Sequence, residues 1–219
     1  MKRLLILILL VLAGCREQTL RETLNSVKDS RTITDRQAET LSKVWTVSLN
    51  SLTSITNEQA ESLSKVKYLQ LNSLTSITDQ QAKSLSKVRN LELNSLTTIT
   101  DQQVESLSKV EVYLSLNGLT SITDAQAEML SQIEILSLDG LTSITDAQAE
   151  SLSRHDRLML NGLTSITDQQ AESLSKVVMY LGLNSLTSLT DTQAESLSKV
   201  ESLHISEALQ PLIDKYKKQ

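Results

Sequence analysis

Residues 66–87 read VKYLQLNSLTSITDQQAKSLSK, and this stretch recurs with small changes along most of the 219-residue chain. The threonine of its ITD step has counterparts spaced by 22 or 23 residues. Self-similarity at a period of this size predicts a repeat architecture, in which one small structural unit is stacked many times. Eight copies are present, marked by Thr34, Thr56, Thr78, Thr100, Thr123, Thr145, Thr167 and Thr190.

Each copy combines a strand period with a helix period. Leu69 and Leu71 flank Gln70, so the two leucines face one side of a short strand and Gln70 faces the other. Further along the unit, Ala82 and Leu85 are spaced to share one face of a short helix. The unit is therefore predicted to be a strand followed by a helix.

The start of the helix carries several local signals. Thr78 is followed three residues later by Gln81, which is the spacing of a capping box, and Ile77 and Ala82 are placed to form a hydrophobic staple. Asp79 puts negative charge at the positive end of the helix dipole. All eight copies keep the Thr and Gln pair, so a helix is expected to begin at the same point of each unit.

One unit alone cannot bury its aliphatic side chains, because a short strand and a two-turn helix offer them no opposite wall. Stacking of neighbouring units supplies that wall. The expected fold is an α/β solenoid, a curved right-handed β-α superhelix with a parallel sheet on the concave face and short helices on the convex face. The repeats are expected to occupy residues 33–206.

The apolar spacing resembles that of leucine-rich repeats. Val66, Leu69, Leu71, Leu74 and Ile77 match the LxxLxLxxNxLxxI pattern of that family, except that Leu74 stands in place of the usual Asn. The ITDxxAxxL portion is similar to the helix-bearing repeats of F-box proteins and to a group of bacterial repeat proteins. The resemblance implies a leucine-rich-repeat solenoid.

A row of amide side chains follows the predicted strands and takes one place in every unit. We expect these residues to form hydrogen bonds in the turns rather than to bind a ligand. They are Asn50, Asn72, Asn94, Asn117, Asn161 and Asn184, with Asp139 in the gap.

The amino terminus predicts export. Residues 1–15 read MKRLLILILLVLAGC, in which two basic residues precede an apolar run from Leu4 to Ala13. This is the layout of a secretory signal, and the run falls short of the ~20 residues that a membrane-spanning helix needs. Residues 1–14 are therefore expected to be a signal peptide.

Residues 12–15, LAGC, resemble the lipobox of bacterial lipoproteins. The resemblance implies that Cys15 is acylated and becomes the new amino terminus. It also implies a lipid-anchored place in the bacterial cell envelope, at the outer membrane or the extracytoplasmic face of the cytoplasmic membrane. The alternative is an ordinary cleaved signal next to a chance cysteine.

Both ends of a stack need caps. Residues 15–32 are expected to hold the lipidated amino terminus and a cap, in which Leu20, Leu24 and Val27 form either a helix or a decayed repeat. Residues 207–219 are expected to form a capping helix and a basic tail. Pro211 would open that helix, whose apolar residues are Leu212, Ile213 and Tyr216.

Two irregularities interrupt the pattern. Two copies carry one extra residue before the strand, around Glu111 and Val178, for which a bulge is the simplest explanation. His155 stands where other copies have Val or Ile, so we expect it to pack in the core rather than to bind a ligand.

Composition argues against several classes of function. The net charge is −5, and removal of residues 1–14, which hold two basic residues and no acid, would change it to −7. An acidic chain without basic clusters argues against nucleic-acid binding and against a polybasic membrane patch. With one cysteine, placed in the lipobox, and two histidines that cannot converge, we expect no catalytic site, no metal site and no cofactor.

The most varied positions of the units face outward from the predicted strands. We expect them to form a protein-binding surface for an unknown partner, so that the chain would be a non-enzymatic, membrane-anchored interaction scaffold. The alternatives are a passive spacer of the cell envelope, or a carbohydrate-binding surface, for which Trp45 is the one large stacking platform. The candidate surface residues are Tyr68, Gln70, Asn90, Glu92, Tyr113, Arg157, Met159 and Tyr180.

Overall fold

The computed structural model describes residues 18–217 of the chain. The predicted signal peptide and the predicted lipidation site at Cys15 lie outside the described residues.

Strands and short helices alternate along the described chain. Eight strands pair in sequence order, every pair parallel. The strands are β1 (Thr46–Ser48), β2 (Tyr68–Gln70), β3 (Asn90–Glu92), β4 (Tyr113–Ser115), β5 (Ile135–Ser137), β6 (Arg157–Met159), β7 (Tyr180–Leu183) and β8 (Ser202–Ile205). The helices are α2 (Asp35–Leu41), α3 (Asn57–Leu63), α4 (Asp79–Leu85), α5 (Asp101–Leu107), α6 (Asp124–Leu130), α7 (Asp146–Leu152), α8 (Asp168–Leu174), α9 (Asp191–Leu197) and α10 (Gln210–Lys217), and residues 18–27 are also helical.

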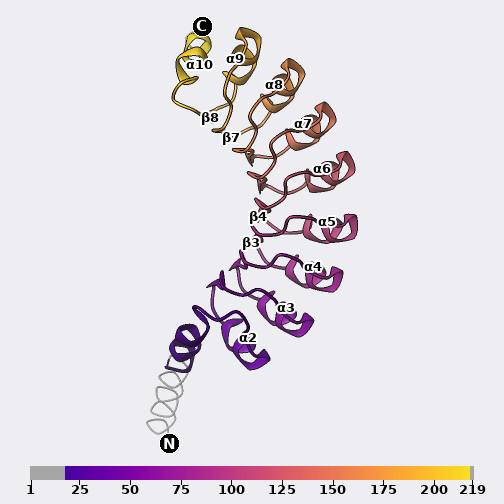
Figure 1. Ribbon diagram of the computed structural model, residues 1–219, viewed down its shortest axis with the longest axis vertical. Coiled ribbons are helices and arrows are strands. Elements are labelled where there is room, and N and C mark those ends of the chain that lie inside the picture. Colours follow the sequence, from indigo (N-terminus) through magenta and orange to yellow (C-terminus); the bar gives the residue numbers. More distant parts are fainter. Residues whose placement is uncertain (1–17, 218–219) are drawn as a thin grey trace, which may run out of the picture.

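The units stack into an arc. The strands line its inner, concave side and the helices α2 to α9 line its outer, convex side (Figure 1). Because a short strand is narrower than a helix, a stack of such units bends toward its strands. The predicted fold class is confirmed.

The core is a column of aliphatic layers that runs the length of the arc. In the unit quoted above, Leu69, Leu71, Leu74, Ala82 and Leu85 are each at most 1% exposed. Full burial of one leucine contributes about 1.5–3 kcal/mol, so each layer depends on the neighbouring layers that cover it.

All eight capping boxes form as predicted. At α4 the Thr78 hydroxyl accepts a hydrogen bond from the Gln81 backbone N–H at 3.1 Å, and Gln81 Oε1 accepts one from the Thr78 N–H at 2.9 Å. Two backbone donors at the helix start are thereby satisfied.

The glutamine of each box makes a second contact that the sequence did not predict. Gln81 Nε2 donates to the backbone oxygen of Ile55 in the preceding unit, at 2.7 Å. A carboxylate could take the first role but not the second, because it has no N–H to donate. The same contact to the preceding unit is made by Gln59, Gln103, Gln126, Gln148, Gln170 and Gln193.

A second ladder follows the strands. The Asn72 N–H donates to Asn50 Oδ1 at 3.1 Å, and the Asn94 N–H donates to Asn72 Oδ1 at 3.1 Å. The ladder continues through Asn117, Asp139, Asn161 and Asn184. The predicted turn role of this row is confirmed, and it explains how the fold manages with Leu74 in place of the usual Asn.

The two ends are capped by helices. Residues 18–27 are helical, which decides against a decayed repeat. Val27 is buried and Leu20 packs against the core, whereas Leu24 is 39% exposed and does not contribute as expected. At the other end α10 begins at Gln210 and covers the last unit with Ile213, Leu212 and Tyr216, as predicted.

The two extra residues do not form bulges. Glu111 and Val178 are exposed in the connections before β4 and β7, and the strand register passes both repeats without interruption. The expectation of a bulge was wrong because the connection absorbs the added residue before strand pairing begins.

His155 is fully buried in the core, as expected. Its Nδ1 lies 2.5 Å from the Ile133 carbonyl oxygen, and its buried Nε2 has no hydrogen-bond partner among the described residues. Burial lowers the pKa of the imidazole, and the contact with the Ile133 carbonyl opposes this shift only in part. His155 is therefore neutral in the folded chain and is a weak point of its layer.

The double role of the box glutamines can be tested at α8, where two glutamines are adjacent. Gln170→Glu should lower the free energy of unfolding by about 1–2 kcal/mol, because the donor to the Ile144 oxygen at 2.9 Å is lost. Gln169→Glu is the control: this side chain is exposed in the same first turn and should leave stability unchanged or slightly raised. Urea unfolding measures both, and equal midpoints for the two variants would contradict the double role.

His155→Ile should raise the free energy of unfolding by about 1 kcal/mol at neutral pH, because an unpartnered buried nitrogen is replaced by the residue type that fits at Ile133. The pKa of His155 in the folded chain lies below 6.5, so as the pH falls the unfolded chain takes up a proton on this histidine before the folded chain does. The free energy of unfolding of the wild type should therefore fall as the pH drops below 6.5. The His155→Ile variant should lack this part of the decrease in the free energy of unfolding. Urea titrations at about pH 7.5 and about pH 5.5 measure the difference, and a constant gap between the two proteins would count against the pH effect.

Candidate functional site

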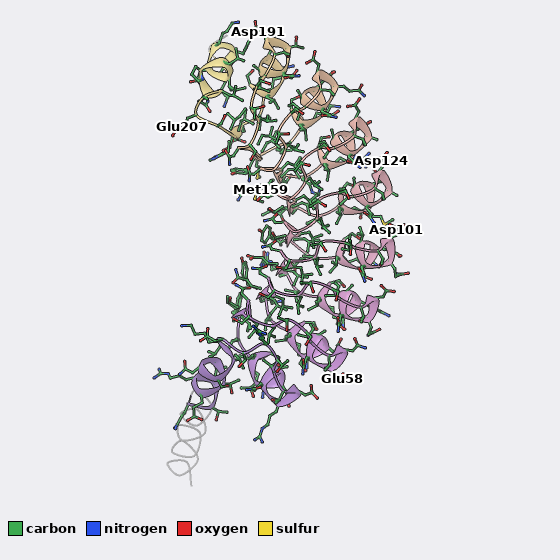
Figure 2. The ribbon with its side chains drawn as sticks, viewed as in Figure 1. Glu58, Asp101, Asp124, Met159, Asp191 and Glu207 are labelled. Atoms are coloured by element: carbon green, nitrogen blue, oxygen red, sulfur yellow. The ribbon has the colours of Figure 1, made fainter. Side chains whose placement is uncertain are left out.

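The concave face carries two columns of outward side chains in the predicted register. Tyr68 pairs with Asn90 and Asn90 with Tyr113 in the first column, while Gln70 pairs with Glu92 in the second. Sheet spacing of about 4.8 Å separates neighbours within a column. All eight candidate surface residues lie in these columns, and Figure 2 shows Met159 on the inner side of the arc, opposite the outer-side Glu58, Asp101 and Asp124.

Three candidate surface residues of β2 and β3, Tyr68, Gln70 and Glu92, bond to one another and to Asn72 in the turn after β2. Glu92 is only 9% exposed. Its carboxylate accepts hydrogen bonds from the Tyr68 hydroxyl, from Gln70 Nε2 at 3.1 Å and from Asn72 Nδ2 at 2.9 Å. We call these residues the Glu92 cluster.

The protonation states of the Glu92 cluster follow from its contacts. Burial alone would raise the pKa of Glu92, but the hydrogen bonds from Tyr68, Asn72 and Gln70 together outweigh burial and hold it below the usual value. Burial and the bond to Glu92 raise the pKa of Tyr68 to about 12. A charged acceptor with neutral donors is stable at neutral pH, so the cluster braces the sheet and offers no free group for chemistry.

The carboxy-terminal half of the concave face is different. Here Ile135 pairs with Arg157 and Arg157 with Tyr180, while Met159 projects beside them from β6. We call Tyr113, Ile135, Arg157, Met159 and Tyr180 the carboxy-terminal patch. Its apolar members are partly exposed, and Arg157 is exposed without an ion pair to another described residue.

Gly182 lies beside this patch in β7. It pairs with Met159 in the second column, where every other repeat carries a side chain. A Cβ at this position would come within 2.8 Å of Asn161 Oδ1, so the ladder residue leaves no room for one. Gly182 thus places no side chain beside Met159 in β7.

Two exposed apolar residues extend the patch and were missed as site residues from the sequence. Val178 is 57% exposed and Met179 is 45% exposed, directly before β7. The sequence signal that could have found them is a pair of apolar residues at the position of the extra residue before the strand. Tyr180 itself packs its ring against His204, with centroids 4.7 Å apart.

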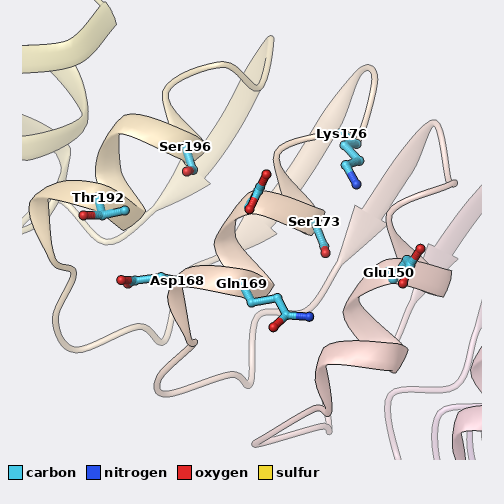
Figure 3. Close-up of a pocket in the computed structure, with 8 residues that line it drawn as sticks. Glu150, Asp168, Gln169, Ser173, Lys176, Thr192 and Ser196 are labelled. Carbon is cyan, nitrogen blue, oxygen red and sulfur yellow. The ribbon is translucent and has the colours of Figure 1, made fainter.

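The convex face holds a polar hollow of about 440 Å³ between α7, α8 and α9 (Figure 3). Glu150, Ser173 and Lys176 in it occupy the places of Glu61, Ser84 and Lys87, where the Lys and Glu charges pair at 2.8 Å. The hollow thus lies where Lys176 and Glu150 do not form the surface ion pair that Lys87 and Glu61 form in an earlier unit. Its full lining is Glu150, Asp168, Gln169, Glu172, Ser173, Lys176, Thr192 and Ser196.

The helix-start acids have structural partners. Asp124 Oδ1 accepts a hydrogen bond from the Thr145 hydroxyl of the next unit at 2.7 Å, and Asp146 accepts one from Thr167 at 3.0 Å. Within residues 18–217, His, Cys, Asp and Glu nowhere gather in threes as a metal site requires. In the same range, every helix is too short or too polar to cross a membrane.

Comparison with known proteins bears on the fold. No protein-family model matches the chain, and no curated protein matches it. Among solved structures, the chain is similar to TLR13 in a complex with ssRNA13, with 19% identity, 78% of this chain and 27% of that chain covered, and a TM-score of 0.57.

Two internalins of Listeria monocytogenes are also similar. For inlF the identity is 16%, the coverage 81% of this chain and 61% of that chain, and the TM-score 0.46. For inlC2 the values are 18%, 80%, 84% and 0.48. The chain thus spans less than two thirds of the inlF chain. The parallel sheet, the short convex helices and the similarity to TLR13 define a leucine-rich-repeat solenoid.

If the Glu92 cluster braces the sheet, two tyrosines of the same column should differ in how much their hydroxyl groups contribute to stability. Tyr68→Phe should lower the free energy of unfolding by about 1–3 kcal/mol, because a buried carboxylate loses a donor. Tyr180→Phe should change it by less than about 0.5 kcal/mol, since that hydroxyl has no hydrogen-bond partner among the described residues. Denaturant unfolding tests the pair, and a Tyr68→Phe variant as stable as Tyr180→Phe would show that the cluster does not brace the sheet.

Proposed function

We propose that this chain is a non-enzymatic interaction scaffold, anchored to a bacterial envelope membrane through lipid on Cys15, which binds a protein partner on its concave face. The observation that carries the binding role is the carboxy-terminal patch. Its aromatic, aliphatic and guanidinium groups stand side by side on the sheet, its apolar members are partly exposed, and Arg157 forms no ion pair with another described residue.

The composition of the patch favours a protein partner. Tyr and Arg are the residue types most enriched among interface anchors, because they bury large area at low cost in side-chain entropy. Tyr113, Ile135 and Met159 supply apolar area, and Arg157 supplies a planar donor for a carboxylate or a backbone carbonyl. The Glu92 cluster, although part of the candidate surface, supports the sheet beside this patch.

Charge argues against RNA as the partner. The similar TLR13 structure is a complex with ssRNA13. Binding to a phosphate backbone requires several cations along one groove. Among the outward side chains of the two columns, Arg157 is the one arginine or lysine and Glu92 is the one acidic residue. The chain as a whole carries a net charge of −5. A protein surface with exposed apolar groups fits this face better than a polyanion does.

The anchoring role rests on the amino-terminal sequence. Cys15 is the one cysteine of the chain and ends the LAGC motif, so acylation gives it a use that disulfide pairing cannot. We place the anchored chain at the outer membrane or at the extracytoplasmic face of the cytoplasmic membrane.

The binding role can be tested by affinity purification from the cell envelope of the source organism. A protein retained by the wild-type chain should bind at least about 30-fold more weakly to an Arg157→Ala, Tyr180→Ala variant, since interface anchors contribute about 2 kcal/mol or more. Thr46→Ala, Ser48→Ala is the matched control, because it truncates the same two columns in β1, outside the patch. Unchanged unfolding midpoints would exclude misfolding.

Three results would contradict the proposal. The partner could bind both variants as it binds the wild type, which would move the site elsewhere. Glycan could be retained in place of protein, which favours a carbohydrate-binding surface. Retention of nothing above the level of an unrelated chain favours the passive spacer.

A further inference from the structure

We propose that the amino-terminal end of the solenoid rests on the lipid surface with Trp45 inserted at the interface, so that the stack projects outward from the membrane. This inference rests on the proposed lipid anchor at Cys15. It goes beyond anchoring, because a tether alone leaves the orientation of the solenoid free.

The tether is short. Position 18, where the described helix of residues 18–27 begins, is three steps along the chain from Cys15, with residues 16 and 17 between them. In any conformation three residues span at most about 11 Å. An acylated Cys15 therefore holds this end of the molecule next to the headgroups, while the other end is free to point away.

Trp45 is suited to such a surface. It is the one tryptophan of the chain and is 77% exposed, directly before β1 in the first unit of the stack. An exposed indole has an apolar body and one N–H donor, which is the combination enriched at membrane interfaces. Leu24, on the cap helix at the same end, is the other large apolar side chain exposed there.

The first unit is held firmly to the cap that bears Leu24. Gln37 Nε2 donates to Ser26 Oγ at 3.1 Å, and the Thr53 N–H donates to the Arg31 carbonyl at 3.0 Å. Val27, at the end of the cap helix, is 1% exposed and belongs to the hydrophobic core. The cap and the first unit thus form one body, and a tether on the cap also positions Trp45.

Charge favours the same orientation. Residues 16–48 hold six basic and five acidic residues, whereas residues 49–219 hold 13 basic and 21 acidic residues. Arg21, Lys28 and Arg31 are exposed and form no ion pair with another described residue. An anionic surface acts over about 8–10 Å, so it accepts this nearly neutral end and repels the acidic remainder.

The single tryptophan allows a direct test on the full acylated chain. Wild-type protein purified from membranes is reconstituted into vesicles of phosphatidylethanolamine and phosphatidylglycerol, and Trp45 emission is recorded with acyl-brominated lipids and with aqueous acrylamide. We expect a shift to shorter wavelength relative to the unacylated Cys15→Ser chain, loss of intensity to brominated lipid, and protection from acrylamide. The Cys15→Ser chain is expected not to float with vesicles.

The matched control moves the fluorophore to the far end. Trp45→Tyr, Glu201→Trp places it at the equivalent position before β8 and leaves the anchor intact. Its emission should be quenched by acrylamide and unaffected by brominated lipid. Equal quenching by lipid at both positions would overturn the end-on orientation.

Failure of the anchor and failure of the docking are distinguishable. An acylated chain that floats with vesicles but keeps Trp45 open to acrylamide and insensitive to brominated lipid would overturn the docking and leave the anchor standing. A chain that carries no lipid by mass spectrometry and does not float would overturn the anchor, and the docking with it.

Discussion

The closure of each layer by its neighbour is the constraint on which the rest of this structure depends. Gln148 shows it in one side chain: its Oε1 accepts from the Thr145 N–H at 3.0 Å within its own unit, and its Nε2 donates to the Ile122 oxygen at 2.9 Å in the preceding unit. The leucines do the same with apolar surface. A unit is therefore complete only inside the stack, and stability is approximately a sum over neighbouring pairs.

This constraint divides the surface into residues that must repeat and residues that are free to differ. The box glutamines, the ladder amides and the leucines are fixed by contacts to the next layer. The outward columns are not held to one residue type, and the chain has used them in two ways. Around Glu92 they bond to one another, so that Tyr68, Gln70 and Asn72 donate to the Glu92 carboxylate. Around Arg157 they form no ion pair with another described residue, and Gly182 places no side chain beside Met159.

The features that the sequence predicted correctly are those that depend only on residues within one repeat. Alternation around Gln70 and the Thr78 and Gln81 spacing depend on local backbone geometry, so the strands, the caps and the outward columns could be read directly. The contact from Gln81 to Ile55, the closure of the Glu92 cluster and the exposure of Leu24 depend on how far apart two layers lie and on which rotamer a side chain adopts. No single-chain pattern encodes those distances. The same limit made Glu111 and Val178 look like bulges.

The solenoid also fixes a distance that a flexible stalk could not. The patch extends from β4 to β7, three to six strand spacings beyond β1, which at about 4.8 Å each is about 14–29 Å along the sheet. That exceeds the screening length of about 8–10 Å, so in the proposed orientation the patch lies outside the field of the membrane surface. Arg157 is then available to a protein carboxylate rather than to lipid phosphate. Near-identical layers would serve this arrangement, because a regular stack is stiff and would keep the patch at a constant height above the proposed anchor.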